Sequence, residues 1–301
     1  MIEDISYPGP RHKLRISAIR FLNPAPLMWD FEHPPQQQPL AERYRIHSAM
    51  PSQCAAELAK GTADIGLIPI AAYATVPGLK IIPGCTIASL DRVRSIVLIV
   101  KHPAGLSSIR RIATDTASRT SNAYAQIILR KFYAVDPEIV PHAPHLDSML
   151  AKCDAAVLIG DPALLALEDQ AARFARTGER LEYFDLAHLW KQHTGVPWVS
   201  AFWAVRPQAI ESSGFGPTQI AQDFIQSRDH GMAHIEDLVR EWSPRISVPA
   251  ATMRTYLSQN IHYVLDEECL RGLDIFFDYA AEYGVLPTAP KLRWLGQPTL
   301  R

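Results

Sequence analysis

Positions 116–121 hold four hydroxyl side chains and one arginine, directly before a predicted helix. The helix is indicated by apolar residues at helical spacing, namely Tyr124, Ile127, Ile128, Leu129 and Phe132. Ser118 or Thr120 suits the N-cap position, and a helix start offers free N–H groups and the positive end of the dipole to an anion. Arg119 adds a planar donor fork that fits a carboxylate, or it points outward from a plainly capped helix. We therefore predict a carboxylate site here.

Two further polar residues lie at the ends of predicted strands. Asn23 follows an apolar run that ends near Arg20, and its amide could contact a ligand or cap the next helix. Ser95 begins an apolar run that continues to Val100, and its hydroxyl could bind a ligand or belong to an ordinary strand serine. Because ligands of parallel sheets bind beyond the carboxyl ends of the strands, Asn23 is expected near the loop 69–73.

Asp161 and Trp198 are two more candidates, each with a structural alternative. Asp161 stands between Gly160 and Pro162 at the entry to a predicted helix, where an aspartate is most often an N-cap. Trp198 and Phe202 share one face of a predicted strand, because their spacing is even. They could line a cleft or fill the core.

The composition excludes several classes of function. The 301 residues carry a net charge of −1 with no polybasic run, so neither nucleic acid nor an anionic membrane is an expected partner. The N-terminus has no apolar signal segment and no run is long enough to span a bilayer, so we expect a cytoplasmic protein. The four cysteines are isolated, the histidines lack metal spacing and no cofactor fingerprint occurs, so we expect no metal and no cofactor.

The order of predicted elements indicates an α/β protein with two lobes. Strands are predicted at 14–20, 44–48, 63–70, 79–87, 93–100, 112–114, 138–141, 155–159 and 199–205. Helices are predicted at 51–61, from 120, at 145–151 and through most of 207–284, with a surface loop at 33–39. Alternating strands and helices imply parallel sheets with crossover helices. We predict a first lobe of residues 1–100 plus 201–301 and an inserted second lobe of 101–200, with a ligand cleft between them.

Six short motifs, in order, resemble the chorismate dehydratase family of the futalosine route to menaquinone. They are Phe21–Leu27, Pro51–Ala55 with Ala63–Pro69, Val93–Ile96, Asp115–Ser121, Ile159–Leu164, and Asp185–Trp190 followed by Thr194–Val199. The resemblance covers roughly residues 14–205 and implies the type II periplasmic-binding-protein fold. It also implies a hydro-lyase that removes water from chorismate, with no cofactor, to give 3-[(1-carboxyvinyl)oxy]benzoate.

The resemblance also implies roles for individual residues. Asn23 and Ser95 would act on the reacting ring. Contacts to the substrate would come from Thr116, Ser118, Arg119, Thr120, Ser121, Gly160, Asp161 and Trp198. Arg20 and His188 depart from the family pattern, which usually has a small or hydroxyl residue and an acidic residue at these positions.

Two other functions remain open from the sequence. One is the paralogous 1,4-dihydroxy-6-naphthoate synthase of the same pathway, which shares the fold. The other is a non-catalytic cytoplasmic protein that binds a small carboxylate, since the fold also serves solute receptors.

Overall fold

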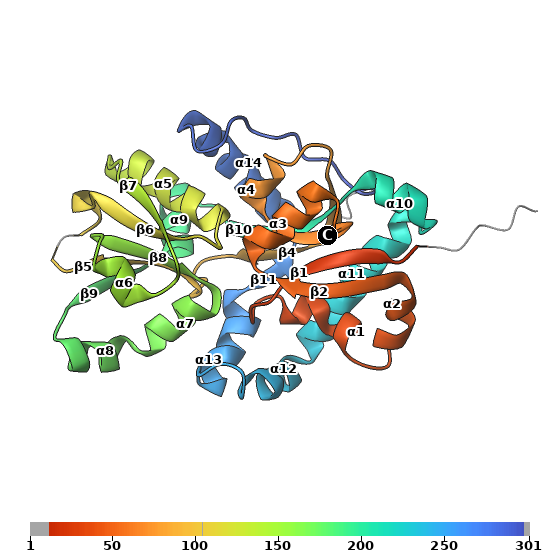
Figure 1. Cartoon of the computed structure of the whole chain (residues 1–301), viewed down its shortest axis with the longest axis horizontal. Helices are drawn as coiled ribbons and strands as arrows, with labels where there is room; N and C mark the ends of the chain where they lie inside the picture. Colours follow the sequence, from red (N-terminus) through yellow and green to blue (C-terminus); the bar gives the residue numbers. More distant parts are fainter. Residues whose placement is uncertain (1–11, 104, 298–301) are drawn as a thin grey trace, which may run out of the picture.

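The chain forms two β-sheets that helices cover, as the computed structural model of residues 12–103 and 105–297 shows (Figure 1). The first sheet has the strand order β11-β4-β10-β3-β1-β2, and the second has the order β7-β6-β8-β5-β9. The strands of the first sheet are β1 (Leu14–Ile19), β2 (Tyr44–Ala49), β3 (Ile65–Pro69), β4 (Lys80–Ser89), β10 (Trp198–Val205) and β11 (His262–Val264). The predicted α/β architecture with two lobes is confirmed.

In the first sheet, several loops lie together at the carboxyl ends of the parallel strands. β1 pairs in parallel with β2 and β3, whereas β10 runs antiparallel to β3 and β4. Every residue of β3 is buried, as expected for a strand with covered faces. After the carboxyl ends of β1, β2 and β3, the chain enters η1 (Ala25–Met28), α3 (Pro51–Lys60) and α4 (Ile70–Tyr73). The loop of Asn23 and the start of α4 therefore lie at the same end of the sheet, beyond the carboxyl ends of β1 and β3, as the sequence predicts.

The second sheet is built from a continuous stretch of the chain. Its strands are β5 (Ile96–Lys101), β6 (Arg111–Asp115), β7 (Glu138–His142), β8 (Ala155–Ile159) and β9 (Leu181–Asp185). Its helices are η2 (Leu106–Ser108), α5 (Thr120–Tyr133), α6 (Leu146–Leu150), α7 (Gly160–Glu168), α8 (Gln170–Thr177) and α9 (Leu186–Thr194). β5, which the sequence interpretation assigns to the first lobe, pairs with β8 and β9 and so belongs to the second sheet.

The chain leaves the first sheet and returns to it at one place. β4 ends at Ser89 and β10 begins at Trp198, and these two residues are partners in the β4–β10 ladder. The return strand β10 then lies between β4 and β3, near the middle of the sheet. Both connections between the lobes are therefore anchored to the same pair of neighbouring strands.

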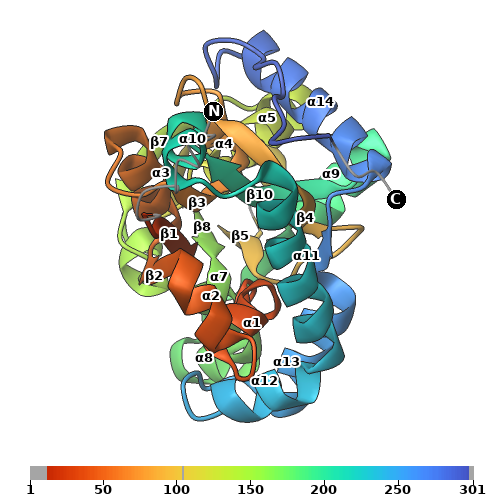
Figure 2. The same cartoon turned by 90° about the vertical axis from the view of Figure 1, so that its right-hand side faces the viewer.

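Helices of the C-terminal region cover the first sheet and reach the second lobe. They are α10 (Pro207–Ser213), α11 (Pro217–Ala233), α12 (Ile235–Trp242), α13 (Ala250–Thr255), the π-helical turn η3 (Tyr256–Asn260) and α14 (Glu267–Glu282). α11 packs on β4 and η1, and α14 packs on β10 and on α5 of the second lobe (Figure 2). Among the described helices, none combines the length and the apolar character that crossing a bilayer requires.

Three elements differ from the prediction, one in the predicted loop at 33–39 and two in the predicted helical stretch at 207–284. Residues Gln37–Arg43 form α2, after the short helix α1 (Trp29–Glu32), although glutamine and proline near position 37 suggest a loop. β11 interrupts a stretch that the sequence pattern assigns to helices alone, and directly before it η3 is a π-helical rather than an α-helical turn. β11 is a three-residue edge strand, too short to show a periodicity of two.

Candidate functional site

A cavity lies between the two sheets, with about 450 Å³ of empty space when the solvent at its mouth is included. Residues of both lobes line it: Ile19, Phe21, Asn23, Pro51, Pro69, Ile87, Ser95, Ile96, Ser118, Thr120, Ser121, Ile159, Gly160, Ser200 and Ala201. None of these described lining residues is charged. A larger groove of about 1520 Å³ lies along α7 and α8, but its described lining contains none of the predicted site residues.

The start of α5 contributes three hydroxyls to the cavity. Ser118 Oγ accepts a hydrogen bond from the Ser121 backbone N–H at 3.2 Å and so caps the helix, while Arg119 at the formal N-cap position makes no side-chain cap. Thr120 Oγ1 accepts from the Ala71 N–H at 3.2 Å, which joins α5 to α4 of the first lobe. The side chains of Ser118, Thr120 and Ser121 are all buried. The predicted cluster is thus assembled as a capped helix start that faces the interlobe space.

Asp115 holds the turn that precedes α5. Its Oδ1 accepts from the Ala117 N–H at 2.8 Å, and its main-chain carbonyl accepts from Asn122 Nδ2 at 3.1 Å. Burial raises the pKa of the Asp115 carboxyl, because desolvation disfavours the charged form. Asp115 does not line the cavity, which agrees with a structural role.

Other helices also begin at the cavity. Pro51 at the start of α3 and Gly160 at the start of α7 are both lining residues. α3, α5 and α7 have 10, 14 and 9 residues, so each carries a full helix dipole whose positive end faces the cavity. Converging helix starts provide positive potential without a charged side chain, and this suits a ligand with negative charge.

Asn23 presents an unpartnered amide oxygen. Its Oδ1 is buried and has no hydrogen-bond partner in the described part of the chain, and the residue lines the cavity. A buried polar atom without a partner carries a desolvation cost that a bound ligand or water removes. The Asn23 Oδ1 is therefore available to a bound ligand or a water molecule.

Ser95 lies at the point where the chain enters the second sheet. Its carbonyl accepts from the Gly160 N–H at 2.7 Å, and its side chain is hydrogen-bonded to the hydroxyl of Tyr256 in η3. Burial raises the pKa of Tyr256, while the hydrogen bond from Ser95 lowers it by a smaller amount. The sequence pattern gives no sign of Tyr256, because its position among apolar helix residues predicts a core side chain.

Gly160 and Asp161 connect the two lobes beside the cavity. Gly160 has φ +62°, and a Cβ there would lie 2.7 Å from Phe21 Cδ2. Asp161 Oδ1 accepts from the Leu22 N–H at 3.1 Å, and burial raises the pKa of this carboxyl to about 6. Asp161 is not a lining residue, so the structure places it as an interlobe bond next to the predicted ligand site.

Thr116 and Arg119 lie outside the cavity, contrary to their predicted position. Both are exposed and line a separate surface groove of about 890 Å³, which shares Ser118 with the cavity. Ser118 and Ser121 line the cavity, while Arg119 between them is exposed on the other side of the helix start. Of the two interpretations of Arg119, the outward one describes its position.

Trp198 lies behind the cavity wall rather than on it. Its side chain is fully buried, and its ring stacks on Tyr124 with centroids 3.7 Å apart. Its Nε1 donates to Ser200 Oγ at 2.7 Å, and Ser200 is a lining residue. The predicted wall position is thus corrected to one of core packing with a single polar link to the cavity.

The comparisons with known proteins agree on one family. A sequence profile described as "Menaquinone biosynthesis" matches residues 14–282. A protein of Thermus thermophilus named chorismate dehydratase is 30% identical over 260 residues, a match that spans 83% of this chain and 90% of that protein. The chain belongs to this menaquinone biosynthesis family.

Solved structures place the menaquinone biosynthesis protein in the predicted fold class. Protein AF1704 from Archaeoglobus fulgidus superposes with a TM-score of 0.67 at 17% identity, covering 91% of this chain and 98% of the other. The periplasmic aliphatic sulphonate binding protein SsuA from Escherichia coli gives 0.61 at 15% identity, with 96% and 93% covered. These similarities confirm the type II periplasmic-binding-protein fold.

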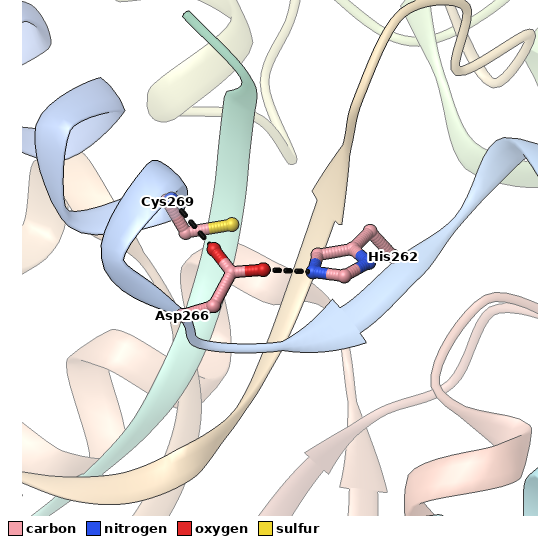
Figure 3. A group of neighbouring side chains, drawn as sticks. All are labelled: His262, Asp266 and Cys269. Carbon is pink, nitrogen blue, oxygen red and sulfur yellow. Dashed lines mark hydrogen bonds and ion pairs between the residues drawn. The ribbon is translucent and has the colours of Figure 1, made fainter. Parts of the chain in front are cut away.

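One group of potential metal ligands occurs among the described residues of this menaquinone biosynthesis protein. His262, Asp266 and Cys269 bring their ligand atoms within 4.8 Å of one another (Figure 3). Asp266 caps α14 by accepting from the Cys269 N–H at 2.8 Å, and its other oxygen lies 2.7 Å from His262 Nε2. Burial raises the pKa of the Cys269 thiol, which opposes the thiolate that a metal needs. The group is built as a helix cap.

Proposed function

We propose that this member of the menaquinone biosynthesis family is a chorismate dehydratase, which eliminates water from chorismate to give 3-[(1-carboxyvinyl)oxy]benzoate. The observation that carries the proposal is the uncharged interlobe cavity onto which α3, α5 and α7 open. A relative named chorismate dehydratase, 30% identical over 260 residues, supports it.

Binding of the substrate would rest on hydroxyls and helix starts. Chorismate carries two carboxylates, and the start of α5 offers backbone N–H groups with the hydroxyls of Ser118 and Ser121 to one of them. Hydrogen bonds to a charged acceptor are stronger than those between neutral groups. Because the side chains of Ser118 and Ser121 are buried, few water molecules compete for these hydrogen bonds.

The chemistry would proceed without a protein base of the usual kind. The described lining residues include no carboxylate, imidazole or amine. The ring hydrogen at C3 must leave as a proton and the C4–O bond must break, so that the hydroxyl departs as water and the ring becomes aromatic. A carboxylate of the substrate itself would serve as the base, and aromatisation supplies the driving force.

Asn23 and Ser95 would guide this elimination. Asn23 lines the cavity, and its amide N–H group would donate to the hydroxyl that leaves. Ser95, which is hydrogen-bonded to Tyr256, would orient the same hydroxyl from the second lobe. Positioned donors of this kind contribute roughly 10²–10³-fold to a rate each.

Turnover of chorismate by the purified protein tests the proposal. Mass spectrometry should show a product that has lost one water and contains an aromatic ring. Tight binding of unchanged chorismate would favour the carboxylate-binding alternative instead. Activity on cyclic dehypoxanthine futalosine, with none on chorismate, would assign the protein to the paralogous synthase.

A further inference from the structure

Ser200 stands at a β-bulge in the strand that returns from the second lobe. In the β10–β4 ladder, Val199 pairs with Ala88 and Ala201 pairs with Ile87, so that Ser200 is the extra residue. A bulge redirects side chains from regular alternation and is common beside active sites. Here its effect is that both Ser200 and Ala201 line the cavity, although neighbours in a regular strand would face opposite sides.

The bulge is held from the second lobe by Tyr124. The Tyr124 hydroxyl donates to the Val199 carbonyl and accepts from the Val199 N–H, both at 3.3 Å. Its ring also stacks on Trp198 at an interplanar angle of 20°. Because Tyr124 belongs to α5, the helix that opens on the cavity also fixes the backbone next to Ser200.

The orientation of the Ser200 hydroxyl follows from its partner. Trp198 Nε1 can only donate, so Ser200 Oγ is the acceptor of their 2.7 Å hydrogen bond. The Ser200 O–H then remains available as a donor on the cavity side, since Trp198 lies behind the wall and is fully buried. A dianionic ligand offers acceptors for this donor.

From this geometry we infer that Ser200 is a further substrate-binding residue, which donates a hydrogen bond to a carboxylate of the substrate from the first lobe. The inference rests on the proposed function and deepens it. It also gives Trp198 a positioning role, because the indole fixes the serine rotamer without touching the substrate.

Steady-state kinetics of four variants test this role. Ser200→Ala should raise KM for chorismate about 10-fold or more and change kcat less than about 2-fold, because a ground-state contact is lost. Ser200→Thr keeps the hydroxyl and should stay near the wild-type KM. Trp198→Phe should raise KM by a smaller factor of about 3. Trp203→Phe removes another buried indole of β10, whose Nε1 has no partner in the described chain, and should leave KM unchanged.

A double variant tests whether Trp198 acts through Ser200. If Trp198 acts only through Ser200, then Trp198→Phe combined with Ser200→Ala should have the KM of Ser200→Ala alone. An unchanged KM in a folded Ser200→Ala variant, or an equal rise in Ser200→Ala and Ser200→Thr, overturns the inference while the dehydratase activity stands. A wild-type protein without activity on chorismate removes both proposals, which is a distinct outcome.

Discussion

Gly160 of the second lobe faces the ring of Phe21 in the first lobe so closely that a Cβ on Gly160 would lie 2.7 Å from Phe21 Cδ2. The next residue, Asp161, accepts a hydrogen bond from the Leu22 N–H, so two consecutive contacts join the same two segments. Both segments also supply cavity residues. The fit of the lobes and the shape of the candidate site therefore depend on one another.

Gly160→Ala should impair both stability and turnover. The residue has φ +62°, which costs a side chain about 1 kcal/mol, and the methyl group would also displace Phe21. Gly178→Ala is the matched control, because Gly178 has φ +68° but no atom within 4 Å of the added carbon. Chemical denaturation should show a larger loss for Gly160→Ala, and equal losses would refute the interlobe contact as the cause.

Asp161 should make stability depend on pH in a defined window. Its folded pKa is about 6, raised by burial from the ordinary 3.8, so the folded chain binds more protons than the unfolded chain between these values. The stabilisation from the neutral carboxyl is therefore complete below about pH 4 and is lost as the pH rises through about 6. Asp161→Asn cannot lose this stabilisation. The difference in unfolding free energy between Asp161→Asn and the wild type should therefore grow in favour of the variant by roughly 1–3 kcal/mol as the pH rises from about 4 to about 7.

The control for Asp161 is an exposed carboxylate elsewhere. Asp136→Asn removes a carboxylate from the surface of the second lobe, where its side chain is 72% exposed. It measures what the loss of one exposed carboxylate, here the ion-pair partner of Arg130, does to the same curve. Parallel stability curves for the wild type and Asp161→Asn would contradict the raised pKa.

Asn23→Ala should reduce turnover strongly with little loss of stability. Its Oδ1 makes no hydrogen bond within the described chain, so the folded protein loses little, whereas a positioned donor at a reacting group contributes roughly 10²–10³-fold to kcat. Asn260→Ala is the matched control, since Asn260 Oδ1 is also buried without a partner but lies outside the cavity. A large fall in Tm, with activity per folded molecule retained, would make Asn23 a structural residue.

Substitutions of the two serines at the start of α5 should have different effects, one on stability and the other on KM. Ser118→Ala removes the cap on the Ser121 N–H and should cost about 1 kcal/mol of stability. Ser121→Ala leaves the cap in place and should raise KM more than it lowers kcat, because a ground-state contact to carboxylate is lost. Arg119→Ala, in the outer groove, is the control and should leave KM within about 3-fold of the wild type. Unchanged kinetics in Ser121→Ala would move the anion site elsewhere.

The sequence predicts the fold class and part of the candidate site for physical reasons. Buried strands such as β3 appear as continuous apolar runs, and strand ends converge by topology, so the position of Asn23 follows from the pattern. The hydroxyl cluster at α5 also follows, because a helix start is a local feature. The sequence does not predict whether the Arg119 side chain points into the cavity or away from it, because this direction depends on the backbone conformation just before the helix.

Other features depend on tertiary contacts that leave no local signal. Regular strand alternation predicts Trp198 and Ser200 on one face of β10. The bulge between Val199 and Ala201 changes this, and the sequence does not predict the bulge because no glycine marks it. Tyr256 reaches Ser95 from a π-helical turn, far away in the sequence. Asp161 lies in the first turn of α7, as the sequence predicts, but it is not the N-cap, and only the folded lobes reveal the Leu22 N–H as the partner of its carboxylate.

The pairing of Ser89 with Trp198 has a consequence for the order of folding. Since β10 lies between β3 and β4, the first sheet stays incomplete until the chain has been synthesised beyond residue 205. By then residues 96–185, which contain all five strands of the second sheet, have already been synthesised. Chains generally fold from the N-terminus as they emerge. The order of synthesis therefore favours completion of the inserted lobe first, and its formation brings together the two ends that the first sheet needs to close.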